Sequence, residues 1–146
     1  NGSDTISFEF ASNKGSSFKD LKKIASGGEL SRIMFSIKII LSRFKSLPTI
    51  IFDDIDTGTS GDISSKIARL MLEMSKTMQV LVISHSPQVA SIGDNHIKVY
   101  KDSSKNNTVT KLKLLNSKER IIEIADMLGG GSGSLTAVQH AKQLLN

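Results

Sequence analysis

The spacing of apolar residues along this chain of 146 residues predicts both helices and strands. Apolar residues that recur every three or four positions predict four longer helices, at about 26–46, 61–76, 117–128 and 134–145. Two uninterrupted apolar runs, 49–53 and 79–84, are rich in β-branched residues. Such runs are typical of strands that are buried on both faces of a parallel sheet.

Three further segments alternate apolar and polar residues, which predicts strands with one buried face. The first contains Ile6, Phe8 and Phe10, and a polar, loop-like stretch follows it. The other two, 96–101 and 108–115, are separated by a polar turn, so they predict a β-hairpin near a sheet edge.

The alternation of strands and helices in the middle of the chain predicts a parallel sheet with right-handed crossovers. A turn and a short helix are expected within 85–94. The expected fold is therefore an α/β lobe with a mostly parallel sheet, flanking helices and an edge β-hairpin. Ligands of such sheets bind beyond the carboxyl ends of the strands. The loops after Phe52 and Ser84 are the places where we expect the chemistry.

Composition narrows the classes of protein that fit. The chain has no cysteine, which excludes disulfide bonds and thiolate metal sites. Its 19 Lys and Arg residues outnumber its 14 Asp and Glu residues, and a net charge of +5 is compatible with polyanions such as nucleotides or DNA. The lysines are scattered, however, so a solvated lysine-rich surface explains the charge equally well.

No apolar run approaches the roughly 20 residues of a membrane span, and the N-terminal sequence does not have the pattern of a signal peptide. We therefore expect a cytoplasmic protein that does not contact a membrane. The sequence begins abruptly, close to a strand, which favours a fragment of a longer protein.

The sequence S-G-G-E, Ser26 to Glu29, opens the first long helix. Ser26 and Glu29 fit a capping box, in which each side chain bonds a free backbone N–H. The capping box does not explain Gly27 and Gly28, because almost any residue would serve there. Paired glycines at a helix N-terminus allow an anion to approach the backbone N–H groups closely. A phosphate site is therefore the alternative to a purely structural cap.

Two adjacent carboxylates, Asp53 and Asp54, end the first apolar strand. Acidic residues at such a strand end commonly hold a metal or polarise water, since an unpaired buried carboxylate is costly. Asp53 suits Mg²⁺ coordination through water, and Asp54 suits general-base work on water. The alternative is that both carboxylates only cap the segment that follows.

His85 directly follows the second apolar strand. A single histidine is more often a cap or a satisfied polar residue than a catalytic one. At this strand end, however, its imidazole can donate a hydrogen bond to a terminal phosphate or orient a water molecule.

The order of these motifs resembles the C-terminal part of an ABC-type ATPase head. "ASGGELSRIMF" resembles the signature motif, "TIIFDD" the Walker B motif, "IDTGTSG" the D-loop with Asp56, and "VISHS" the switch histidine. Together with the closing "ERIIEIADMLGG" and "AVQHAKQLL", these motifs resemble the RecN family of bacterial DNA repair proteins. That family is related to the structural-maintenance-of-chromosomes (SMC) proteins, and the resemblance covers nearly the whole chain.

The resemblance implies that two heads sandwich two ATP molecules in a homodimer that tethers DNA at double-strand breaks. Ser26, Gly27, Gly28 and Glu29 would form the signature surface for the γ-phosphate held by the opposite head. Asp53 would support Mg²⁺, usually through water, and Asp54 would activate water. His85 would contact the γ-phosphate in cis, and Asp56 would communicate across the dimer.

Two departures from the family pattern matter. The family usually has glutamate where Asp54 stands, and a displacement of about 1 Å can cost on the order of 100-fold in rate. The sequence also contains no G-x-x-x-x-G-K-[ST] motif, and "GGGSGS" at 129–134 is interpreted as a linker. Residues 1–146 are therefore expected to form a single C-terminal lobe, without the Walker A lobe and the coiled coil. This lobe would need its N-terminal partner lobe and would be inactive as an ATPase alone.

Two alternatives remain open. One is an ABC ATPase subunit of another system, such as transport, although Glu29 and the closing helices argue against it. The other is an ABC-shaped interaction module that has lost hydrolysis, which Asp54 leaves open.

Overall fold

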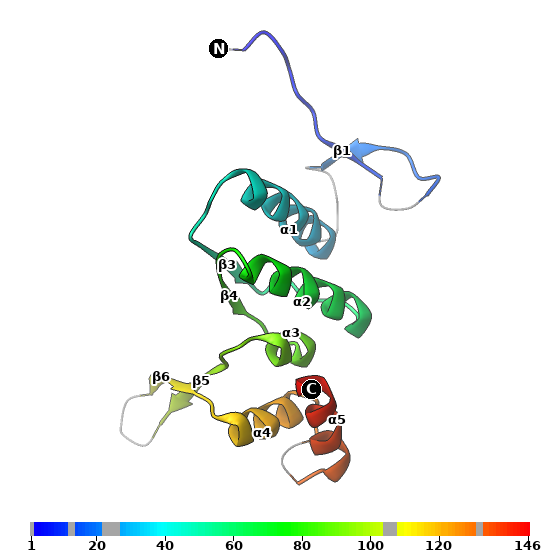
Figure 1. The fold of residues 1–146 in the computed structure, drawn as a ribbon. Coiled ribbons are helices and arrows are strands. Elements are labelled where there is room, and N and C mark those ends of the chain that lie inside the picture. Colours follow the sequence, from blue (N-terminus) through cyan, green and yellow to red (C-terminus); the bar gives the residue numbers. More distant parts are fainter. Residues whose placement is uncertain (1, 12–13, 22–26, 104–107, 131–132) are drawn as a thin grey trace.

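The computed structural model describes residues 2–11, 14–21, 27–103, 108–130 and 133–146, and it has the predicted α/β character (Figure 1). The elements are β1 Glu9–Phe10, β2 Lys19–Asp20, α1 Gly27–Phe44, β3 Thr49–Asp53, α2 Gly61–Ser75, β4 Gln79–Ile83, α3 Pro87–Ile92, β5 Ile97–Asp102, β6 Val109–Leu114, α4 Ser117–Met127 and α5 Leu135–Leu145. Each predicted helix and each predicted apolar strand in the middle of the chain is confirmed within one or two residues.

The centre of the fold is the parallel pair β3–β4, with helices on one side of it (Figure 1). Ile50 lies opposite Val80 and Phe52 lies opposite Val82, so these four side chains share one face. That face packs against residues from α1, α2 and α3. In the described part of the chain, parallel pairing is confined to these two strands, while β1–β2 and β5–β6 are antiparallel.

The main hydrophobic core is centred on Phe52, whose side chain is only 1% exposed. Its ring meets Phe35 of α1 edge to face, with the ring centroids 5.0 Å apart and the planes at 71°. Met71 and Met74 of α2 are buried in the same cluster. Such aromatic and thioether contacts fix α1 and α2 on the sheet.

The opposite face of β3–β4 is exposed, contrary to the expectation of burial on both faces. Ile51, Leu81 and Ile83 point to this side and are 57%, 44% and 59% exposed. The apolar run predicted cover on both faces, but the described helices supply it on one face only. These strands therefore carry apolar side chains on a face that the described residues leave exposed.

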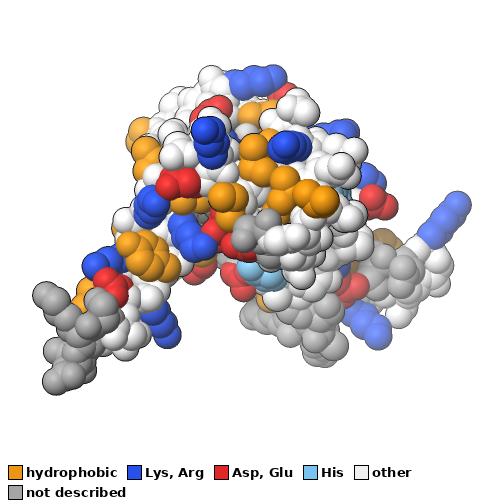
Figure 2. Space-filling view, turned by 90° about the horizontal axis from the view of Figure 1, so that it is seen from below, with side chains coloured by type: hydrophobic (Ala, Val, Ile, Leu, Met, Phe, Trp, Pro, Cys, Tyr) orange, Lys and Arg blue, Asp and Glu red, His pale blue; other side chains and the backbone are white. Residues whose placement is uncertain are grey.

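The hairpin β5–β6 forms the predicted antiparallel pair and projects beside the helices (Figure 1). One of its faces carries Ile97, Val99, Leu112 and Leu114, all of them exposed. Figure 2 shows hydrophobic and charged side chains together at the surface of this projecting arm. The hairpin therefore also presents an apolar face that the described residues leave uncovered.

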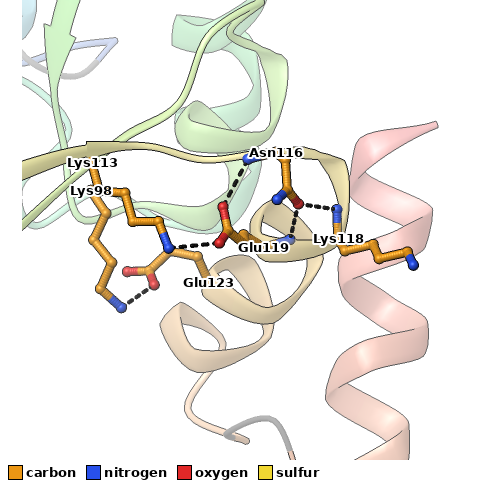
Figure 3. A network of polar contacts seen from close by, with 6 residues as sticks. All are labelled: Lys98, Lys113, Asn116, Lys118, Glu119 and Glu123. Carbon is orange, nitrogen blue, oxygen red and sulfur yellow. Dashed lines mark hydrogen bonds and ion pairs between the residues drawn. The ribbon is translucent and has the colours of Figure 1, made fainter.

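Ion pairs and a helix cap fix the other face of the hairpin to α4 (Figure 3). Lys98 pairs with Glu123, and Lys113 Nζ lies 2.6 Å from Glu119 Oε1. Asn116 and Glu119 form a complete capping box at the start of α4. The lysine hydrogen bond, followed by the Asn116 backbone hydrogen bond, holds the pKa of Glu119 below its ordinary value. The polar face of the hairpin is thus turned inward, toward α4.

Helices α4 and α5 pack through a small second core that includes Ile124, Ala125, Ala137 and Ala141. The first two glycines of the "GGGSGS" segment take part in this packing. Gly129 N–H and Gly130 N–H donate to the carbonyls of Asp126 and Ala125, which is a Schellman cap. Gly129 adopts the left-handed φ of 80° that this cap requires. The interpretation of 129–134 as a linker is therefore wrong for its first two residues.

The N-terminal strand is shorter than its alternating pattern suggests. Among the described residues, the strand is limited to Glu9 and Phe10, which pair with Asp20 and Lys19, two residues for which the sequence predicted a loop. Ile6 and Phe8 are exposed, so the expected buried face is not formed by the described residues. Alternation predicts a strand face correctly only where another layer covers that face.

Candidate functional site

The loops that follow β3 and β4 leave the sheet side by side. Asp53 and Ile83 are register partners at the ends of the two strands. One residue further, the Asp54 N–H donates to the Ile83 carbonyl at 2.9 Å. The two loops that the sequence marked for chemistry therefore begin at the same edge of the sheet, as expected for parallel strands.

Asp54 and His85 are brought together at this edge. His85 Nδ1 lies 3.0 Å from Asp54 Oδ1, although the two residues are 31 positions apart in the sequence. The side chain of His85 is 69% exposed and that of Asp54 is 55% exposed, so the pair faces solvent. Asp54 has a φ of 50°, a left-handed conformation that aspartate tolerates better than most residues. This backbone turn places the carboxylate beside the histidine.

The electrostatics of the pair favour an ionised carboxylate. A hydrogen bond from the Thr57 side chain, and then the contact with His85, hold the pKa of Asp54 below its ordinary value. A carboxylate can only accept, so His85 must donate through Nδ1. The Nε2 atom of the neutral ring then carries the free lone pair. Protonation of the ring would convert Nε2 into a donor, which is the form suited to phosphate.

Asp56 lies in the same loop but is buried, with 4% of its surface exposed. Ser84 Oγ donates to Asp56 Oδ2 at 2.5 Å. The other carboxylate oxygen, Oδ1, is buried without a hydrogen-bond partner among the described residues. The carboxylate expected to communicate across a dimer is thus turned inward and bonded within its own chain.

Asp53 ends β3 with an exposed side chain. In the described part of the chain, no three acidic or histidine side chains gather as a metal site. A single exposed carboxylate fits Mg²⁺ bound mainly by phosphate and water, which is how Mg²⁺ is usually held in nucleotide sites. It does not fit a metal site built from protein ligands alone.

The first turn of α1 begins at Gly27 and includes Gly28 and Glu29. Ser26 lies outside the described residues, so the predicted capping box is not seen. No hydrogen bond or ion pair among the described residues joins this turn to Asp54 or His85. The next turns contribute Leu30, Ser31 and Met34 to a groove of about 240 Å³ that Phe52 and Ile55 also line. The groove brings α1 close to the loop between Asp54 and Asp56.

The structure therefore brings together two of the predicted residues, Asp54 and His85, and adds two that sequence reasoning missed, Thr57 and Ser84. Ser84 ends the apolar run directly before His85, and that position was its only signal. Nothing in the sequence indicates that its hydroxyl bonds to Asp56.

Known proteins similar to this chain include DNA repair proteins. No known family profile matches it. DNA repair protein RecN of Halalkalibacterium halodurans is 40% identical over 146 residues, and RecN of Bacillus subtilis is 41% identical over 144. This is a RecN-related chain. The two matches cover 100% and 99% of this chain. They cover only 26% of the Halalkalibacterium halodurans RecN and 25% of the Bacillus subtilis RecN, so this chain spans about a quarter of the length of these relatives.

Solved structures show that this RecN-related chain has the fold of SMC head domains. A structure from work on ATP-driven dimerization and DNA-stimulated activation of SMC ATPases has a TM-score of 0.67 and 24% identity, covering 90% of this chain and 77% of that one. An Smc head domain from Pyrococcus furiosus, bound to the C-terminal domain of ScpA, has a TM-score of 0.61 and 26% identity. The coverage is 79% of this chain and 27% of that one. Among the described helices, none is both long and apolar enough to cross a membrane.

Proposed function

We propose that residues 1–146 form the C-terminal lobe of an ATP-hydrolysing head in a RecN-type protein that acts at DNA double-strand breaks. The observation that carries the proposal is the exposed Asp54–His85 pair at the carboxyl edge of β3–β4. A carboxylate and an imidazole that share one solvent-facing edge can orient water and contact a terminal phosphate. The similarity to DNA repair protein RecN supports DNA repair as the setting, and the similarity to a structure from work on SMC ATPases supports ATP as the substrate. We propose the cytoplasm, at the nucleoid, as the location.

The bare face of β3–β4 supports the need for an N-terminal lobe. Parallel sheets are stable when both faces are covered, and a pair of strands is marginal by itself. Ile51, Leu81 and Ile83 leave one face open, while RecN relatives are about four times as long as this chain. We assign the missing cover to the N-terminal lobe of the same polypeptide, which would also bring the Walker A loop.

In this proposal each site residue has a defined task. Asp53 would hold Mg²⁺ through water, and the ion would offset the charge of the phosphates. Asp54 orients the attacking water, and His85 faces the γ-phosphate from the same head. Gly27 and Gly28, with Ser26 and Glu29, present the N-terminus of α1 to the nucleotide of a second head.

The proposal is tested by ATPase assays on two forms of the protein. The purified 146-residue chain should neither bind ATP tightly nor hydrolyse it, and the intact protein that contains it should do both. His85→Ala should abolish hydrolysis by the intact protein. Robust hydrolysis by the isolated chain that His85→Ala removes would refute the assignment of a separate Walker A lobe.

The sheet face is tested by association with the N-terminal lobe. Co-expressed lobes should copurify, and Ile83→Lys should prevent this because it places a charge on the covered face. Leu135→Lys is the matched control, because Leu135 is an exposed leucine on α5, away from β3–β4. If both substitutions leave copurification intact, the N-terminal lobe does not cover this face.

A second candidate function is favoured by one observation, the aspartate at position 54. It is one methylene shorter than the family's usual glutamate, and it is already engaged with His85. A head of this kind would bind ATP and associate without hydrolysing it. ATP-dependent dimerisation without measurable turnover in the intact protein would support this function over the first.

A further inference from the structure

We propose that Ser84 and Asp56 are positioning residues that hold His85 in place, a proposal that rests on the hydrolytic function proposed for the Asp54–His85 pair. Two side-chain contacts join the loop after β3 to the loop after β4. One is the exposed contact of His85 with Asp54, and the other is the buried contact of Ser84 with Asp56. In this proposal the exposed contact carries out the chemistry, and the buried contact fixes the position of His85.

The exposed contact is too weak to set its own geometry. Both side chains of the Asp54–His85 pair are more than half exposed. Solvent-exposed ion pairs contribute little, commonly below about 1 kcal/mol, because water and salt screen them. A fixed imidazole orientation therefore needs support from other contacts of these loops.

Asp56 is anchored through both its backbone and its side chain. Thr59 donates to the Asp56 carbonyl twice, from its N–H at 3.1 Å and its Oγ1 at 2.6 Å. Thr59 Oγ1 also lies 2.7 Å from Ser64 Oγ at the start of α2. The buried carboxylate is thus a fixed point that belongs to the β3–α2 loop.

Ser84 connects the anchored Asp56 carboxylate to the backbone around His85. Its hydroxyl donates to Asp56 Oδ2 and accepts the N–H of Ser86 at 2.9 Å. Ser84 and Ser86 flank His85, so one hydroxyl holds the backbone on both sides of the imidazole. The directions are unambiguous, since an N–H can only donate and a carboxylate can only accept.

Loss of the Ser84 hydroxyl is expected to change the position of His85. Asp56 Oδ1 has no partner among the described residues, so Ser84→Ala would leave both oxygens of a buried carboxylate without a hydrogen bond from them. A buried, unsatisfied carboxylate is costly, and the loop is expected to shift to expose it. A displacement of about 1 Å at a reacting group can lower the rate on the order of 100-fold.

The kinetic test uses the intact protein. Ser84→Ala should lower kcat by about 10-fold to 100-fold while KM for ATP stays within about twofold. Ser84→Thr restores the hydroxyl and should recover most of kcat. Ser75→Ala is the matched control, because its exposed hydroxyl bonds to a carbonyl within α2.

A spectroscopic test is independent of turnover. Long-range ¹H–¹⁵N spectra of histidine-labelled protein, assigned with His85→Gln, report which ring nitrogen of neutral His85 carries the proton. The wild type should hold it on Nδ1, facing Asp54, and Ser84→Ala should give a mixture of tautomers. If the wild type does not hydrolyse ATP but this shift is seen, the proposed function fails and the positioning role stands.

The positioning role is overturned by any of three results. Where the wild type hydrolyses ATP, two of these results are an unchanged kcat in Ser84→Ala and no recovery in Ser84→Thr. The third, with or without hydrolysis, is a tautomer that does not respond to Ser84→Ala. If Ser84→Ala does not fold, Asp56→Ala removes the same bond from the other side and is measured in its place.

Discussion

His85 Nδ1 and Asp54 Oδ1 lie 3.0 Å apart and come from loops that follow two parallel strands. The contact makes the carboxylate and the imidazole a single unit, because a change in one alters the hydrogen bonding of the other. Asp54 is also the residue at which this chain departs from the glutamate usual in the family it resembles. Its substitution is therefore the most direct probe of the site.

Asp54→Glu in the intact protein is expected to raise the rate of ATP hydrolysis, because the longer side chain would extend the carboxylate toward the water that we propose it activates. Asp54→Asn keeps the size and tolerates the left-handed φ of 50°, so it removes the charge alone. It should lower kcat by at least about 10-fold, as expected for loss of a general base. Steady-state ATPase assays measure both effects. Equal rates for the wild type, Asp54→Glu and Asp54→Ala would show that Asp54 is not the base.

Much of this site could be predicted from the sequence. Uninterrupted apolar runs located β3 and β4, and the polar residues at their ends identified Asp54 and His85. Their proximity follows from parallel strands, whose carboxyl ends share one edge. The prediction of a shared edge is confirmed, because it depends on local pattern and on chain direction alone.

Other features depend on which atoms meet in space, and the sequence does not record this. The Ser84–Asp56 contact requires a particular loop path and rotamer, and many serines near a strand end make no such bond. Gly129 and Gly130 looked like linker residues because glycine is common in both linkers and helix caps. The bare face of β3–β4 could not be predicted. An apolar run indicates that both faces of a strand are suited to burial, but it does not show whether this chain contains the residues that cover them.

Phe52→Ala is expected to destabilise the fold by about 3–5 kcal/mol, because it removes the ring at the centre of the main core. Phe52 is 1% exposed and packs edge to face on Phe35. Phe44→Ala is the matched control, since Phe44 is 82% exposed, and it should change stability by less than about 0.5 kcal/mol. Urea unfolding followed by circular dichroism measures the difference. Similar losses in the two variants would place the core elsewhere.

His96 is expected to make stability depend on pH between neutral and mildly acidic conditions. Burial, followed by repulsion from Arg120, lowers the pKa of His96 from its ordinary 6.5. Lys98 acts in the same direction, and Glu123 opposes it. A buried Nδ1 without a hydrogen-bond partner among the described residues fits a ring that stays neutral in the fold.

The sign of this pH dependence follows from proton uptake. The unfolded chain binds a proton at His96 near its ordinary pKa, and the folded chain does so only at lower pH. The free energy of unfolding is therefore greatest above pH 6.5 and falls as the pH drops toward the folded-state pKa. Thermal midpoints at about pH 7.5 and about pH 5.5 measure the loss, and His96→Gln should make it smaller.

Gly130→Ala is expected to separate α4 from α5. A Cβ at Gly130 would lie 2.3 Å from Ala137 Cβ, closer than two carbon atoms can approach, and Ala137 is buried in the contact between the two helices. Since one helix must move, the expected destabilisation is about 1–3 kcal/mol, as for overpacking of a core.

The matched control for Gly130→Ala is Gly133→Ala, in the same connection between α4 and α5. A Cβ at Gly133 would meet open space, with no atom within 4 Å, and the φ of Gly133 is not left-handed. Gly133→Ala should therefore keep the stability of the wild type. Urea unfolding of both variants measures the difference, and equal midpoints would show that α4 and α5 do not pack closely at Gly130.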